Sequence, residues 1–227
     1  MTNTQQALEL VTHGQFIGLG TGRAATAFMH ELAARIRAGL RVRCVPTSQT
    51  TAAIAKSLNI PLVTLDEAQE LDLTVDGADE VDPDLNLIKG YGGALIREKM
   101  VAAASRQLVI LVGSEKLVSR LGERGILPVE VSPFAAAACQ QRLTELGFRP
   151  KLRKSGAAPF VSDNGNLILD AHVGPLENPR EVEQAILANS GVVGTGFFLQ
   201  MAEVVFVQDG DQVREMRRAV ASEMVGG

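Results

Sequence analysis

The chain has 227 residues, of which 46% are hydrophobic and 21% are charged. These values are ordinary for a globular protein and exclude global disorder. The 26 acidic residues outnumber the 22 basic ones, so the formal net charge is −4. We therefore expect neither nucleic acid nor an anionic membrane as a partner, because proteins that bind polyanions typically carry an excess of basic residues.

The first half of the chain alternates short apolar runs with helical patterns. The apolar runs predict strands at residues 16–19, 41–45, 71–75 and 108–112. The helical periodicity predicts helices from about residue 25 to Gly39, at 51–58 and at 94–104. Strands that alternate with helices indicate a parallel sheet with helices on both faces.

The pattern changes near Gly125. A strand is predicted at 127–131, two more at 160–161 and 167–169 around a turn, and a closing one at 192–198. Two helices lie between them, each opened by a capping residue and a proline, at Ser132-Pro133 and Asn178-Pro179. The order β-α-β-β-α-β is that of a ferredoxin-like unit. A strand at 204–207 and a helix from 213 to 224 would then rejoin the first domain, which makes the small domain an insertion.

Cysteine and histidine give little support for a metal centre. Cys44 and Cys139 form no CxxC pair, and we expect both thiols to be buried. The three histidines are scattered without the spacing of metal ligands. The first residues lack the pattern of a signal peptide, and no apolar run approaches the roughly 20 residues needed to span a bilayer. The expected compartment is the cytoplasm.

In open α/β sheets, ligands bind beyond the carboxyl ends of the strands, and a glycine-rich turn falls at such a place. Gly20, Thr21 and Gly22 lie between the first strand and its helix. Glycines let the backbone approach an anion, and the following helix supplies N–H donors. The turn is neither a GxGxxG fingerprint nor a P-loop, so a plain tight turn explains it equally well.

An acidic segment follows the strand at 71–75. Five carboxylates lie between residues 76 and 84, namely Asp76, Asp79, Glu80, Asp82 and Asp84. Crowded carboxylates repel one another, so such a segment marks either a functional site or a solvated acidic turn. A metal site is a further alternative, although no histidine accompanies the segment.

A second glycine-rich loop begins at Lys89 and enters the helix that carries Glu98. Taken alone, Glu98 is a carboxylate near a helix N-terminus, where negative charge is favourable. Together with the acidic segment and Lys89, it forms a carboxylate–lysine–carboxylate set suited to proton transfer. Lys116 follows the strand at 108–112 and is either a surface lysine or a contact for an anion.

These segments resemble the type A family of ribose-5-phosphate isomerases. The resemblance rests on Gly18 to Gly22, the DGADE segment at 76–80, Lys89-Gly90 and the run from Gly92 to Lys99, and it extends in order along nearly the whole chain. It implies an enzyme of the non-oxidative pentose phosphate pathway that interconverts ribose 5-phosphate and ribulose 5-phosphate through an enediol, with no cofactor and no metal. The implied fold is a Rossmann-like α/β domain (1–125 and 200–227) with an inserted ferredoxin-like α+β lid (126–199), in a homodimer.

The resemblance also implies roles for individual residues. Glu98 matches the base that moves a proton between C1 and C2, while Asp76, Asp79 and Lys89 match the groups that handle the sugar hydroxyls, ring opening and the enediol. The implied contacts to the phosphosugar are Thr21, Gly22, Arg23, Ala24, Gly77, Ala78, Gly90, Tyr91, Gly92 and Lys116. The first loop departs from the family pattern GTGST, since Arg23 and Ala24 replace two hydroxyl residues. Arg23 either grips phosphate through its guanidinium or points outward.

Two other functions are weighed against the isomerase. A phosphosugar sensor would carry a DNA-binding module, for which the segment before the first strand is too short, and it has no need of Asp76, Lys89 and Glu98 together. An enzyme similar to acyl-CoA transferases would use a glutamate nucleophile, but the sequence shows no signal for a site of the size of CoA.

Overall fold

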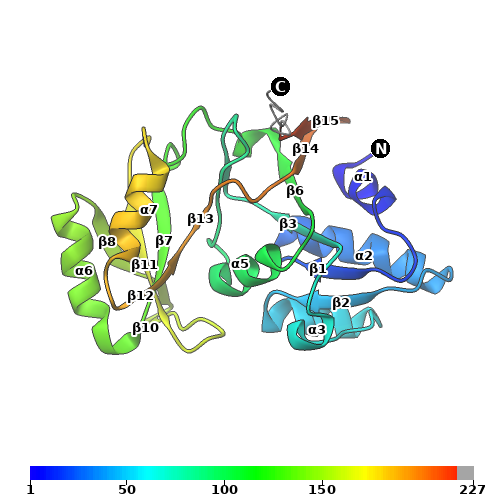
Figure 1. Ribbon diagram of the computed structural model, residues 1–227, viewed down its shortest axis with the longest axis horizontal. Coiled ribbons are helices and arrows are strands. Elements are labelled where there is room, and N and C mark those ends of the chain that lie inside the picture. Colours follow the sequence, from blue (N-terminus) through cyan, green and yellow to red (C-terminus); the bar gives the residue numbers. More distant parts are fainter. Residues whose placement is uncertain (219–227) are drawn as a thin grey trace, which may run out of the picture.

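A six-stranded sheet forms the centre of one of the two lobes of the molecule (Figure 1). The computed structural model describes residues 1–218. The sheet has the order β15-β14-β6-β3-β1-β2, in which β15 is the only antiparallel strand. Its strands are β1 (Phe16–Leu19), β2 (Arg43–Pro46), β3 (Leu73–Gly77), β6 (Leu108–Gly113), β14 (Val204–Asp209) and β15 (Gln212–Arg217). The predicted parallel sheet is thus confirmed.

Helices cover both faces of this sheet, as the alternating pattern predicts. On one face, α1 (Asn3–Glu9) and α2 (Arg23–Arg37) bury apolar side chains such as Phe28 and Leu32 against the strands. On the other face lies α5 (Leu95–Ala103), whose Ala102 packs with Ile110 of β6. Two further helices, α3 (Gln49–Ser57) and α4 (Leu65–Ala68), follow β2. In the part of the chain that the structure describes, no helix is both long and apolar enough to cross a membrane.

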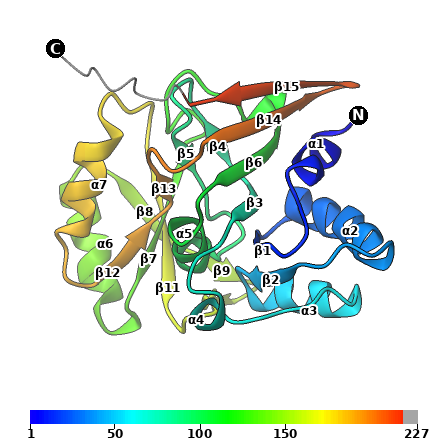
Figure 2. The ribbon, with the colours of Figure 1, turned by 45° about the vertical axis from the view of Figure 1, so that its right-hand side comes forward.

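The second lobe is an antiparallel sheet with two helices, seen beside the first lobe in Figure 2. Its strands, β7 (Ile126–Val131), β8 (Arg149–Leu152), β11 (Leu167–His172) and β12 (Val192–Thr195), have the order β12-β7-β11-β8. The short η2 (Pro133–Ala135) leads into α6 (Ala136–Glu145), and α7 (Pro179–Leu187) precedes β12. This is the β-α-β-β-α-β order that the sequence predicts for a ferredoxin-like unit.

One strand of this unit is not where the sequence placed it. The predicted strand at 160–161 is wrong as a member of the sheet, because Val161 forms only an isolated bridge to Leu167. The second strand is β8, and the chain between β8 and β11 forms a small hairpin of β9 (Lys154–Ser155) and β10 (Ala158–Pro159). At the sheet edge, β8 tolerates Pro150 and exposed basic side chains, so its sequence resembles a loop.

The predicted closing strand at 192–198 is in fact two strands in different sheets. While β12 pairs with β7, β13 (Phe197–Phe198) pairs with β5 (Leu87–Ile88), which pairs with β4 (Glu80–Val81). Phe197 packs into the core of the second lobe and Phe198 into the core beside the large sheet. Successive residues of a strand point to opposite faces, so β13 joins the two cores.

The predicted helix from 213 to 224 is wrong over its described part, because β15 occupies residues up to Arg217. Residues beyond 218 lie outside the described part of the chain. Val213 and Met216 are spaced like neighbours on a helix, but they pack on opposite faces of the sheet. The two-residue turn Gly210-Asp211, with φ +54° at the glycine, is a hairpin signal that the periodicity obscured. Cys44 and Cys139 are both buried, as predicted.

Candidate active site

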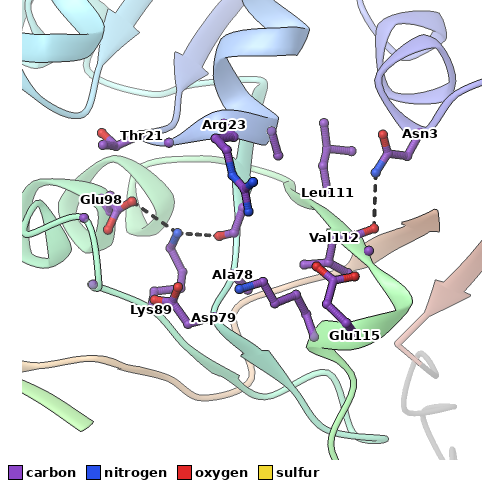
Figure 3. A pocket seen from close by; sticks show the side chains of 17 residues that line it. Asn3, Thr21, Arg23, Ala78, Asp79, Lys89, Glu98, Leu111, Val112 and Glu115 are labelled. Carbon is purple, nitrogen blue, oxygen red and sulfur yellow. Dashed lines mark hydrogen bonds and ion pairs between the residues drawn. The ribbon is translucent and has the colours of Figure 1, made fainter. Parts of the chain in front are cut away.

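A cavity of about 310 Å³ lies at the carboxyl end of the large sheet. The order of the parallel strands reverses between β1 and β3, and ligands of open α/β sheets bind at such a switch point. The loops after β1, β3 and β6 all reach the cavity, and the loop before α5 completes it (Figure 3).

The loop after β1 approaches the loop after β3 closely. A Cβ atom at Gly20 would lie 2.1 Å from Asp76 Oδ1, so only glycine fits there. Thr21 N donates to the same oxygen at 3.1 Å, and the Thr21 hydroxyl lies 2.8 Å from that of Thr47. Gly22, with φ +107°, is the N-cap of α2 and offers no side chain to the first amides of the helix. The start of α2 is therefore open to an anion.

Lys89 lies at the centre of the buried groups of the site. Its ammonium nitrogen lies 2.9 Å from Asp76 Oδ2 and 3.3 Å from Glu98 Oε1, and it donates to the carbonyl of Gly77 at 2.5 Å. All three charged side chains are buried, and Asp76 Oδ1 also accepts from Gly77 N. If both carboxyl groups were ionised, the single cation between them would leave a net negative charge in a region of low dielectric constant.

This environment sets the protonation of the cluster. Burial alone would lower the pKa of Lys89, but the charges of Asp76 and Glu98 raise it above its usual range, so Lys89 is an ammonium ion. The pKa of Glu98 is raised to about 8, chiefly by burial, with Lys89 opposing the rise and Asp76 adding to it. A carboxyl group with such a pKa can both accept and release a proton near neutral pH.

The two oxygens of Glu98 differ in their surroundings. Oε1 faces Lys89, whereas Oε2 is buried and has no hydrogen-bond partner among residues 1–218. Glu98 lines the cavity, and Figure 3 shows its carboxylate turned towards Lys89 at the cavity edge. A buried carboxylate oxygen without a donor is costly, and a substrate in the cavity can relieve that cost.

Asp79 is a second acidic group at the cavity. Its side chain is half-buried, which raises its pKa, and Oδ2 accepts from the amide of Tyr91 at 3.0 Å. The bond joins the acidic segment to the glycine-rich loop before α5. The two segments that the sequence singled out thus meet at one cavity.

Most of the residues that the sequence nominated line this cavity. They are Thr21, Gly22, Arg23, Ala24, Gly77, Ala78, Asp79, Lys89, Gly90, Gly92, Glu98 and Lys116. Arg23 is exposed, and in Figure 3 its side chain extends from the start of α2 towards the cavity. Asp76 is not among the lining residues and lies beneath the cavity against Lys89. Tyr91 is also outside the lining, and its hydroxyl donates to the carbonyl of Ile126 at 3.3 Å.

Sequence reasoning missed several lining residues, namely Asn3, Leu111, Val112, Gly113 and Glu115. The last four end β6 or follow it, so the strand-end rule could have found them alongside Lys116. Asn3 comes from α1 and donates through its side chain to the carbonyl of Val112 at 3.2 Å. No local pattern predicts this contact, because it depends on how α1 packs.

The fold and the cavity together describe an α/β enzyme with buried acid–base groups beside an open helix N-terminus. Comparison with known proteins narrows this class. The family model of ribose 5-phosphate isomerase A (phosphoriboisomerase A) matches residues 43–212. The chain belongs to this family.

Individual relatives agree with the family match. Ribose-5-phosphate isomerase A of Roseiflexus sp. (strain RS-1) is 48% identical over 222 residues, covering 96% of this chain and 95% of the relative. That of Gloeobacter violaceus is 49% identical over 209 residues, covering 92% and 91%.

Solved structures of similar proteins share the fold. Ribose 5-phosphate isomerase A from Methanocaldococcus jannaschii is 39% identical, with a TM-score of 0.91 over 95% of this chain and 96% of that one. A D-ribose-5-phosphate isomerase in complex with phospho-erythronic acid is 34% identical, with a TM-score of 0.92 and the same coverage of both chains.

Proposed function

We propose that this chain interconverts ribose 5-phosphate and ribulose 5-phosphate with Glu98 as the base. The observation that carries the proposal is the state of the Glu98 carboxyl group, which lines the cavity, has one oxygen without a partner and has a pKa raised to about 8. Such a group can take the proton from C2 of the open-chain aldose and return it to C1. The complex of a related isomerase with phospho-erythronic acid supports the class of substrate.

Removal of the C2 proton places negative charge on the oxygens at C1 and C2, which form an enediolate. The ammonium group of Lys89, 3.3 Å from Glu98 Oε1, and the amides of Gly90 and Gly92 are donors that belong to residues lining the same cavity as Glu98. Donors that are held in place before the reaction stabilise such charge without reorganising. Asp76 does not line the cavity, so we assign it the role of holding Lys89 and both neighbouring loops.

The phosphate group is assigned to the opposite side of the cavity. The uncapped start of α2, at Gly22 to Ala24, offers backbone donors, while Arg23 and Lys116 bring positive side chains. Together they can hold a dianion although the protein as a whole is acidic. Binding energy at this end positions the reacting carbons against Glu98. Asp79 is placed to accept the proton of a sugar hydroxyl during ring opening.

Three further parts of the proposal concern organisation and rest on the family resemblance. The chain divides into a Rossmann-like domain (1–125 and 200–227) and an inserted ferredoxin-like domain (126–199). It forms a homodimer in the cytoplasm. Sedimentation of the purified protein tests the dimer, because a monomer has half the expected mass.

The test of the proposed function is turnover of ribose 5-phosphate by the purified protein in the presence of EDTA. We expect ketose to form, and we expect Glu98→Gln to lower kcat by about 100-fold or more while the fold is kept. Glu145→Gln, at an exposed carboxylate on α6, is the control and should be fully active. Near-normal turnover by Glu98→Gln would exclude Glu98 as the base. The absence of any turnover by the unmodified protein would favour a phosphosugar sensor, and loss of turnover with EDTA would indicate a metal.

A further inference from the structure

The loop before α5 brings two residues with unpaired backbone donors to the cavity. Gly90 and Gly92 line the cavity, and within residues 1–218 their amides donate to no protein group. Gly90 and Gly93 have φ of +107° and +83°, the left-handed conformation that glycine accepts readily. The loop lies outside regular secondary structure. Within it, Gly93 N donates to the carbonyl of Gly90 at 3.0 Å, and the other restraints on its geometry are contacts from outside.

The outer side of this loop is held by an arginine from the other lobe. Arg153 lies between β8 and β9, and its side chain is only 13% exposed. Its Nη1 donates to the carbonyl of Gly90 at 2.8 Å and to that of Tyr91 at 3.1 Å. The Tyr91 carbonyl belongs to the same peptide unit as the Gly92 amide, so its bond fixes the direction of that amide directly. The Gly90 carbonyl belongs to the peptide unit between the two free amides, so its bond fixes the path of the chain from one to the other.

Arg153 is itself held in place by two neighbours. Its Nε donates to Asp170 Oδ2 at 3.0 Å, and its Nη2 pairs with Asp170 Oδ1, which makes a two-pronged ion pair. Its guanidinium lies over the ring of Phe160 at 5.9 Å. That ring fills the space that a Cβ atom at Gly93 would need, at 2.4 Å. Arg153, Phe160 and Asp170 thus form a platform for the loop.

Neither charged member of this platform lines the cavity, so the ion pair does not touch the substrate. An ion pair withdrawn from water contributes little to stability compared with apolar side chains of the same size. A guanidinium that donates to two carbonyls instead fixes the orientation of their peptide groups, which apolar side chains cannot do.

We propose that Arg153 is a positioning residue for the isomerase reaction and that it fixes the amides of Gly90 and Gly92 against the oxygens at C1 and C2. The inference rests on the proposed function. It makes the second lobe a fixed part of the catalytic site, beyond any role in covering it.

The test uses steady-state kinetics of Arg153→Met with ribose 5-phosphate, and inhibition by inorganic phosphate. We expect kcat to fall by at least about tenfold, because small misplacements of donors are costly in the transition state. KM and the inhibition constant of phosphate should stay within about twofold, since the phosphate end is held elsewhere. Arg153→Lys keeps the charge but loses the planar fork, so its kcat should lie between those of the unmodified protein and Arg153→Met. Arg142→Met, at an exposed arginine on α6, is the control and should leave kcat, KM and the inhibition constant of phosphate unchanged.

A folded Arg153→Met protein with kcat within about twofold of the unmodified protein would overturn the inference. So would a loss seen only in KM or in phosphate inhibition, because it would place the effect at the other end of the substrate. If Arg153→Met does not fold, Asp170→Asn replaces it, with a fall in kcat expected and an unchanged kcat overturning the inference. Glu98→Gln is measured in the same series. If the unmodified protein converts ribose 5-phosphate, Glu98→Gln does not and Arg153→Met is fully active, then the inference about Arg153 fails and the proposed function stands. If the unmodified protein does not convert ribose 5-phosphate, the proposed function is refuted as well.

Discussion

Replacing Asp76 by asparagine tests how the buried cluster sets the protonation of Glu98. Asp76 is one of the causes that raise the pKa of Glu98 to about 8, so Asp76→Asn should lower that pKa. The asparagine carbonyl can still accept from Thr21 N and Gly77 N, which both donate to one oxygen of Asp76. The change therefore removes a charge while keeping the local backbone contacts.

The structure bounds the size of the effect. Lys89 Nζ lies 2.9 Å from Asp76 Oδ2 and 3.3 Å from Glu98 Oε1, so these two oxygens are about 6 Å apart at most. At an effective dielectric constant of about 20, two unit charges at about 6 Å repel by about 3 kcal/mol, which corresponds to about 2 in pKa. The amide dipole of asparagine retains a part of this, and we expect the pKa of Glu98 to fall by at least about 1.

The assay is kcat/KM for ribose 5-phosphate as a function of pH. The base must be ionised to act, so activity should rise as the pH passes through about 8 in the unmodified protein. In Asp76→Asn the rise should occur at lower pH, even if the plateau is reduced by the altered position of Lys89. The substrate phosphate titrates at about pH 6 and should do so equally in both proteins.

Asp79→Asn is the matched comparison. Asp79 also raises the pKa of Glu98, but it is the least of the contributing causes. Its variant should shift the rise in the same direction and by less. If the rise does not move in Asp76→Asn, or moves to higher pH, then repulsion between Asp76 and Glu98 does not set the protonation of the base and the reasoning is refuted.

Two other predictions concern the first loop. If the guanidinium of Arg23 holds the phosphate, Arg23→Ala should raise KM by about tenfold with little change in kcat. The control is Arg37→Ala, at the exposed far end of α2, which should leave KM unchanged. Equal KM values in both variants would mean that Arg23 points away from the phosphate. Gly20→Ala should lower the free energy of unfolding by about 1 to 3 kcal/mol, because the new Cβ atom would lie 2.1 Å from Asp76 Oδ1. Urea denaturation measures this loss, and unchanged stability would show that Asp76 can move aside.

The cavity could be located from the sequence because it follows from one topological rule. Parallel strands end at the same edge of a sheet, so residues that follow different strands meet there although they are far apart in the chain. This brings Thr21, Asp79 and Lys116 to one place. Glu98 needed a second inference, since only its pairing with Lys89 distinguishes it from an ordinary acidic residue in a first helical turn.

The contacts between the lobes could not be predicted in the same way. The sequence separation between Arg153 and Gly90 is 63 residues, and nothing local to either marks the contact. The split of 192–198 into two strands has the same origin, because Phe197 and Phe198 bond to β5 rather than continue along β7. Edge positions misled the prediction too, since a strand with one solvated side needs little apolar sequence, as at Pro150.

The path of the chain between the lobes has a consequence for how such a protein can change over time. The chain enters the second lobe along β7 and leaves it along β12, and Gly196 N donates to the carbonyl of Pro128 at 2.7 Å. The segments that lead into and out of the second lobe are therefore neighbours. A short turn joining them would close the chain of the larger lobe without stretching its backbone. An excursion with adjacent ends can be lengthened, exchanged or deleted as a module. In this protein the hydrogen bond from Arg153 to the carbonyl of Gly90 links the second lobe to the active-site loop, so deletion of the second lobe would remove a contact that holds this loop.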